Sequence, residues 1–120
     1  MKVKVTSKFV EDWQPAAETL MAEAEEGLTD IGYIALINKI DDAPKTKSGK
    51  FGFNVIVELT EHEIALLKHE AQYRMEYWSL IYQDCKADID RPSHTAAKKL
   101  YLALGGEITK IMADRMGIKK

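Results

Sequence analysis

The chain has 120 residues, of which 46% are hydrophobic and 30% charged, a balance typical of a globular protein with one core. Seventeen Lys and Arg against nineteen Asp and Glu give a formal charge of −2, which excludes a global positive field for nucleic acid or anionic membrane. No run of about eighteen apolar residues occurs, so a membrane-spanning helix is not expected. A single domain over residues 1–120 is expected.

The single cysteine and the first residues of the chain indicate in which cellular compartment the protein is expected. The one cysteine, Cys85, cannot form an internal disulfide, and a thiol on an apolar helical stripe usually packs as a small hydrophobic group. The opening residues carry no apolar segment of signal-peptide length. We therefore expect a cytoplasmic protein.

The first elements are a strand and a long helix. Residues 2–9 alternate between valines and lysines, which is typical of a short edge strand. Asp12 is a candidate N-cap for a helix with Pro15 in its first turn. Apolar residues keep one face in register across Gly27, which favours a single helix over residues 14–41. A break near Gly27 followed by a strand at 32–40 remains the alternative, because that segment is rich in β-branched residues.

A loop and a second strand come next. Residues 41–50 contain Pro and Gly and no periodic pattern, which predicts a loop. Apolar residues then alternate from Phe51 to Leu59, which predicts a strand with one apolar face. Thr60 and Glu63 have the spacing of a capping box, so a long helix is expected from there to about residue 89.

The last element is a C-terminal helix. Residues 90–93 are expected to end the long helix, and a final helix is expected over residues 94–116. Gly105-Gly106 interrupts it and marks a bend or a close approach of another backbone. The sequence thus predicts an α+β fold, predominantly helical, with two long helices and a C-terminal helix packed on a small antiparallel sheet whose strands lie near 2–9 and 50–59.

The long helix carries two stripes of apolar and aromatic side chains. Each stripe recurs at steps of three and four residues and so follows one face. A helix in a domain of this size needs only one buried stripe, so the second is expected to meet another part of the chain or a neighbouring molecule. The first comprises Ile64, Leu67, Ala71, Met75, Trp78, Tyr82 and Cys85, and the second comprises Leu66, Tyr73, Tyr77 and Leu80.

The central prediction is therefore self-association through the long helix. Aromatic residues crowd into three of its turns, a density typical of interface hot spots and also of ordinary cores. Arg74 interrupts the apolar pattern, and at an interface it would need a carboxylate partner across it. The predicted interface comprises Tyr73, Arg74, Tyr77, Trp78, Ile81 and Tyr82.

A second predicted contact region is the loop before the second strand. It comprises Pro44, Lys45, Lys47 and Lys50. Three lysines so close together suit phosphate, nucleic acid or an acidic protein, and an ordinary solvated loop is the competing interpretation.

No motif for catalysis, metal or cofactor binding is found in the sequence. His62-Glu63 begins like a zinc-protease motif, but Leu66 stands where the second imidazole would have to be. Cys85 has no neighbouring base, and Ser48-Gly49-Lys50 lacks the pattern of a phosphate-binding loop. Glu23, Glu25 and Glu26 are most simply a solvated helical face. We expect that the protein is not an enzyme and that it binds no cofactor and no metal.

The first fifty residues resemble the opening of the small tail-completion, or head–tail joining, proteins of long-tailed bacteriophages. The resemblance rests on the strand from Lys2 to Lys8, the helix after it, Ala43-Pro44, and Ser48-Gly49-Lys50. It implies a non-enzymatic ring subunit in the neck or tail of a virion, which contacts copies of itself and adjoining connector proteins.

Three function classes follow from these patterns. The leading hypothesis is a non-catalytic structural or adaptor protein that acts as a homo-oligomer, as a phage neck subunit would in the host cytoplasm and in the virion. The alternative is a small phage-type regulatory protein that inhibits a host enzyme or defence complex. A nucleic-acid-binding module is a further alternative, disfavoured by the charge balance.

Overall fold

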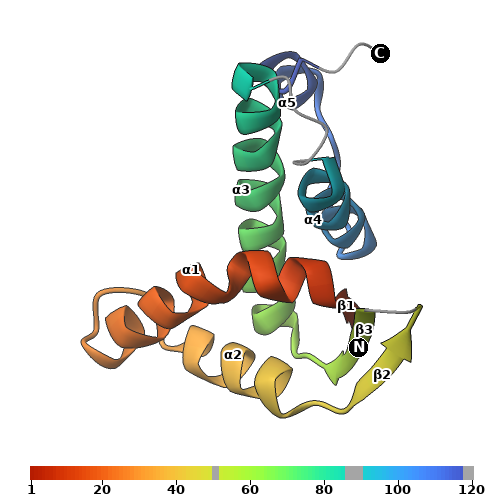
Figure 1. Ribbon diagram of the computed structural model, residues 1–120. Coiled ribbons are helices and arrows are strands. Elements are labelled where there is room, and N and C mark those ends of the chain that lie inside the picture. Colours follow the sequence, from red (N-terminus) through yellow and green to blue (C-terminus); the bar gives the residue numbers. More distant parts are fainter. Residues whose placement is uncertain (50–51, 86–90, 118–120) are drawn as a thin grey trace. The chain divides into compact units, whose positions relative to one another are not determined.

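A computed structural model describes residues 1–49, 52–85 and 91–117 (Figure 1). The chain forms two compact units, Met1–Leu67 and Lys68–Lys120, and each is described by itself. The predicted class, a predominantly helical α+β fold with a small antiparallel sheet, is confirmed. The prediction of a single domain stays a prediction. The elements are β1 (Lys2–Thr6), α1 (Ser7–Glu25), α2 (Gly32–Asp42), β2 (Lys45–Ser48), β3 (Gly52–Glu58), α3 (Glu61–Cys85), α4 (Arg91–Ala103) and α5 (Lys110–Arg115).

The sheet of the first unit has the strand order β1-β3-β2, and both pairings are antiparallel. Val3 pairs with Val57 and Val5 with Val55, so the predicted alternation places one apolar face on the core. A third strand, β2, stands where the sequence predicted only a loop. The extra strand is stabilised by pairing with β3, a partner that local composition does not reveal.

Helix α1 begins seven residues earlier than predicted. Thr6 is its N-cap, and the Thr6 hydroxyl accepts a hydrogen bond from the backbone N–H of Phe9 at 3.5 Å. The prediction that Asp12 caps this helix is therefore wrong, and Pro15 lies in the helix interior. The buried side of α1 carries Phe9, Trp13, Ala17 and Ala24.

The prediction of one helix over residues 14–41 is also wrong. Gly27 has φ +77°, a left-handed conformation that ends α1. The N–H of Leu28 donates to the carbonyl of Glu23 at 2.8 Å, and the N–H of Gly27 to that of Ala24 at 3.2 Å, which together form a Schellman motif. The break is where the alternative placed it, but the segment after it is the helix α2 and not a strand.

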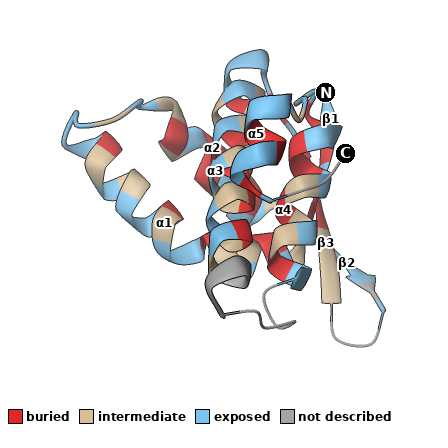
Figure 2. Cartoon of the chain, turned by 90° about the horizontal axis from the view of Figure 1, so that it is seen from above, coloured by how far each residue is buried: buried red, intermediate tan, exposed pale blue. Residues whose placement is uncertain are grey.

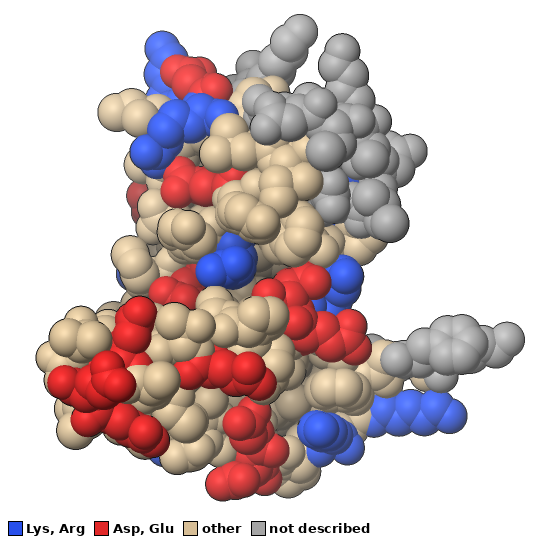
Figure 3. Space-filling model, turned by 60° about the vertical axis from the view of Figure 1, so that its left-hand side comes forward, with Lys and Arg blue, Asp and Glu red and all other residues tan. Residues whose placement is uncertain are grey.

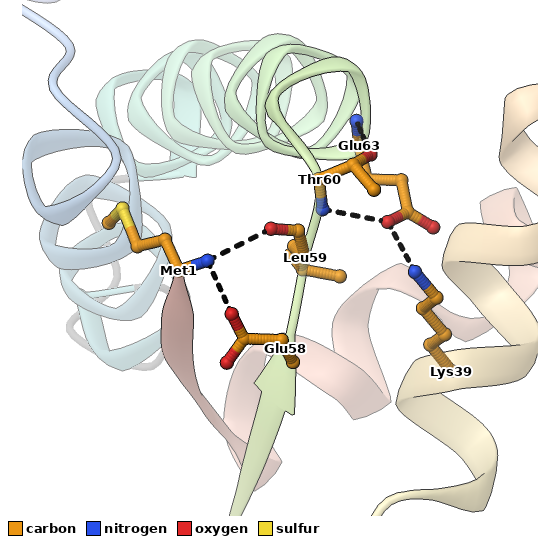
Figure 4. A network of polar contacts seen from close by, with 6 residues as sticks. All are labelled: Met1, Lys39, Glu58, Leu59, Thr60 and Glu63. Carbon is orange, nitrogen blue, oxygen red and sulfur yellow. Dashed lines mark hydrogen bonds and ion pairs between the residues drawn. The ribbon is translucent and has the colours of Figure 1, made fainter.

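The predicted capping box at the start of α3 is confirmed. Glu63 N–H donates to the Thr60 hydroxyl at 3.2 Å, and Thr60 N–H donates to the Glu63 carboxylate at 2.9 Å (Figure 4). The same carboxylate accepts from Lys39 of α2 at 2.6 Å. The Met1 ammonium lies nearby and donates to Glu58 and to the carbonyl of Leu59. The cap thus joins α2, β3 and α3 within the first unit.

The second unit contains the later turns of α3 together with α4 and α5. The prediction of one helix over 94–116 is wrong, because Gly105 has φ +88° and ends α4. Gly106 lies against the ring of Tyr101, so its lack of a side chain is required by packing. Thr109 then caps α5. Arg91 begins α4 instead of ending α3, and residues 86–90 of the predicted helix end lie outside the described residues.

Polar contacts join the helices around the apolar core of the second unit. Met75 of α3 is fully buried, and its carbonyl lies 3.0 Å from Nδ1 of His94 on α4. The Ser79 hydroxyl donates to the carbonyl of Met116 at 3.0 Å. Figure 2 shows the buried residues on the inner sides of these helices. The core of this unit includes Met75, Ala97, Leu100, Tyr101, Met112 and Met116.

Candidate interaction surfaces

Helix α3 has one buried and one exposed stripe, and both are apolar. On the first stripe, Leu67, Ala71 and Met75 have no exposed surface. On the second, Tyr73 is 55%, Tyr77 41% and Leu80 53% exposed, whereas Leu66 is half-buried. We call Tyr73, Tyr77 and Leu80 the α3 face. The described part of the chain leaves these three large side chains open to solvent.

Arg74 flanks the α3 face and lies over its tyrosines. The centre of its guanidinium is 4.9 Å from the ring centroid of Tyr73 and 5.6 Å from that of Tyr77, which is cation–π geometry. Its Nε is buried and has no hydrogen-bond partner in the described part of the chain. Stacking on two rings holds this planar cation beside an apolar surface, where it can meet a carboxylate.

The other predicted interface residues differ in position. Trp78 is half-buried, and its ring meets that of Tyr77 edge-on, with centroids 5.2 Å apart and an interplanar angle of 75°. Ile81 is also half-buried, and the side chain of Tyr82 lies outside what the structure describes. On another edge of the α3 face, Arg115 of α5 forms an ion pair with Glu76 at 2.6 Å. The predicted set therefore lies on α3, and Tyr73 and Tyr77 are the most exposed of its described side chains.

The predicted lysine loop is partly a strand. Lys45 and Lys47 lie on β2 and are exposed, and Nζ of Lys45 is 5.0 Å from the ring centroid of Phe53. Lys50 lies outside the described residues. Pro44 is exposed and lines an open cavity of about 540 Å³ together with Lys39, Asp42, Ile56 and Glu58. The structure thus separates the predicted contact residues between a cavity wall and an edge strand.

Two carboxyl groups of the first unit have lowered pKa values through contacts beside this cavity. Burial raises the pKa of Glu63, but the hydrogen bonds from Lys39 and Thr60 lower it by a larger amount. The pKa of Glu63 therefore lies below its usual value. The Met1 ammonium lowers the pKa of Glu58 through a 2.6 Å hydrogen bond. Both groups act structurally, because each carboxylate accepts hydrogen bonds that join neighbouring elements.

The loop between α1 and α2 forms a surface that sequence reasoning missed. Leu28 is 70% and Ile31 74% exposed, and acidic side chains surround them. No Lys or Arg occurs from residue 9 to residue 38, a segment with seven Asp and Glu. Figure 3 shows acidic side chains dominating the α1–α2 end of this unit. We call this surface the acidic tip, and it comprises Glu23, Glu25, Glu26, Leu28, Asp30 and Ile31.

The acidic tip is tied to α3 by one side chain. Oδ2 of Asp30 lies 2.9 Å from Nε2 of His62, and Oδ1 accepts from the N–H of Gly32 at 2.8 Å. These contacts, led by the hydrogen bond with His62, lower the pKa of Asp30. A Cβ at Gly32 would crowd the His62 ring, so glycine permits this contact. The signal that could have found the tip was the long segment without a basic residue.

Within the described ranges, no group of three or more His, Cys, Asp or Glu side chains could hold a metal ion. No helix of the described residues has both the length and the apolar character needed to cross a membrane. Comparison with protein families, with curated proteins and with solved structures finds no match to this chain. The resemblance to phage head–tail joining proteins therefore stays a prediction.

Proposed function

We propose that the protein is a non-catalytic assembly subunit that associates with copies of itself through the α3 face. The observation that supports this proposal is the difference in burial between the two apolar stripes of α3. One stripe is buried at Leu67, Ala71 and Met75, while Tyr73 and Tyr77 remain open to solvent. Tyrosine and arginine are among the side chains that most often dominate the binding energy of protein interfaces.

The stacking around Arg74 adds a second reason. The side chain is already ordered on the rings of Tyr73 and Tyr77, so binding costs little further conformational entropy. An aromatic surface with a fixed cation suits a partner that brings both apolar groups and carboxylates. The resemblance of residues 1–50 to phage head–tail joining proteins suggests that this assembly is the neck or the completed tail of a phage.

Sedimentation velocity across the micromolar range tests the proposal. The wild-type chain is expected to form oligomers as its concentration rises, and the double variant Tyr73→Glu/Tyr77→Glu is expected to remain monomeric because it places charge on the α3 face. Leu102→Glu is the matched control, since Leu102 is 45% exposed on a different helix of the same unit. A wild-type chain that stays monomeric throughout, or a tyrosine variant that associates like wild type, would overturn the proposal.

A further inference from the structure

The acidic tip combines exposed apolar groups with a single sign of charge. Leu28 and Ile31 are among the most exposed large hydrophobic residues of the described chain. Glu25, Glu26 and Asp30 lie beside them and are exposed as well. An aliphatic pair ringed by carboxylates suits a partner surface that is apolar at its centre and positively charged at its rim.

The tip is also held in a defined conformation. In a Schellman motif, the residue two places after the helix cap usually packs on the last turn of its own helix. Leu28 occupies that position here, and its N–H bonds to Glu23, but the side chain remains 70% exposed. The contact of Asp30 with His62, in which Oδ2 and Nε2 lie 2.9 Å apart, fixes the other side of the loop. The backbone is therefore ordered while its apolar side chains stay uncovered.

A surface with the complementary features exists on the second unit. Residues 1–67 carry seven Lys and Arg against twelve Asp and Glu, whereas residues 68–120 carry ten against seven. On that second unit, the α3 face presents two tyrosines and a leucine beside the guanidinium of Arg74. The two units of one chain thus have opposite charge, and each exposes an apolar patch.

We propose that the acidic tip of one copy docks on the α3 face of a second copy. Leu28 and Ile31 then meet Tyr73 and Tyr77, and a glutamate of the tip supplies a carboxylate to the guanidinium of Arg74, whose Nε has no hydrogen-bond partner in the described part of the chain. This inference rests on the proposed function. It adds that the contact between copies is head-to-tail, because two different surfaces meet. Such a contact leaves a free tip and a free face at the ends of every open assembly, so it closes only as a ring, of which a dimer with two reciprocal tip–face contacts is the smallest, or continues as a chain.

Two variants that each block one surface test this arrangement. The tip variant is Leu28→Lys/Ile31→Lys, in which exposed side chains gain a charge that repels Arg74. The face variant is Tyr73→Glu/Tyr77→Glu. Ile56→Lys is the matched control for the tip, because Ile56 is an exposed residue of the same unit on the outer side of β3. Circular dichroism checks that each variant keeps its helical fold.

The expected result is that each variant alone is monomeric and that an equimolar mixture forms a complex through the one intact tip and the one intact face. The control is expected to associate like wild type. Association of wild type is also expected to weaken as salt rises, because opposite charges meet at the rim of the contact.

Three results would overturn the inference. If the tip variant associates as wild type does while the face variant is monomeric, the contact is face-to-face and the proposed function stands without the tip. If both variants are monomeric and their mixture forms no complex, tip and face do not bind each other. If the wild-type chain itself is monomeric, the proposed function fails together with the inference.

Discussion

Nζ of Lys39 on α2 lies 2.6 Å from Oε1 of Glu63 in the first turn of α3. The same carboxylate closes the capping box with Thr60. Only 5% of the Glu63 side chain is exposed, whereas that of Lys39 is 41% exposed. One buried carboxylate therefore satisfies the end of one helix and binds a cation from another.

The carboxylate of Glu63 should stabilise the protein in two ways that can be measured separately, through the ion pair and through the capping box. Glu63→Gln keeps the capping box and loses the ion pair, and we expect a loss of about 1 kcal/mol in the free energy of unfolding. Glu63→Ala loses both, with an expected loss of about 2 kcal/mol. Urea unfolding of these variants and of Lys39→Met, as a double-mutant cycle, measures the coupling. A Lys39–Glu63 coupling of zero would contradict this account.

Acid should weaken the first unit through the carboxyl groups whose pKa values are lowered. Asp30, Glu58 and Glu63 have lower pKa values in the folded protein, so each stabilises the fold above its unfolded pKa, and the contribution is lost as pH falls through the folded pKa. We expect the free energy of unfolding to fall from about pH 5 downward. Asp30→Asn should make this fall shallower, and Glu18→Gln, which removes an exposed carboxyl of α1 outside these three contacts, is the control.

The parts of the fold that were predicted correctly are local in sequence. Thr60 and Glu63 lie three residues apart, and their hydrogen bonds follow from that spacing. Val3 and Val5 alternate as a strand does. The exposed stripe on α3 was also visible, because helical periodicity alone separates Tyr73 and Tyr77 from Leu67.

The parts that were missed depend on choices that local patterns do not decide. Thr6 and Asp12 are both good N-caps, and the pairing of β1 with β3 ends at Thr6, which favours the earlier start of α1. The face of α1 continues in phase across Gly27, although the chain reverses there. The acidic tip was not predicted because the exposure of Leu28 and Ile31 is a property of packing, and because Glu23, Glu25 and Glu26 have the pattern of an ordinary solvated helical face.

Gly27, which ends α1, should respond to substitution differently from Gly106. Gly27→Ala forces a left-handed φ on a residue with a side chain but meets no neighbour, so a loss of about 1 kcal/mol is expected. Gly27→Asn should lose less, since asparagine tolerates that conformation. Gly106→Ala should lose more, because its Cβ would overlap the Tyr101 ring. Thermal unfolding measures the order of these losses, and equal losses for Gly27→Ala and Gly106→Ala would contradict it.

The two tryptophans should differ when each is replaced by phenylalanine. Trp13 is 2% exposed and packs beside Phe9, with ring centroids 5.8 Å apart, so Trp13→Phe leaves a cavity and should lose about 1–3 kcal/mol. Trp78→Phe keeps the edge contact with Tyr77 and removes an indole N–H that is buried without a partner in the described chain. Leaving such a donor unsatisfied costs about 1–3 kcal/mol, so its removal offsets the lost packing and the net change should lie within about 1 kcal/mol. Urea unfolding of both variants, monitored by circular dichroism, measures the difference in the free energy of unfolding. A larger loss at Trp78 than at Trp13 would contradict this account of the buried indole N–H.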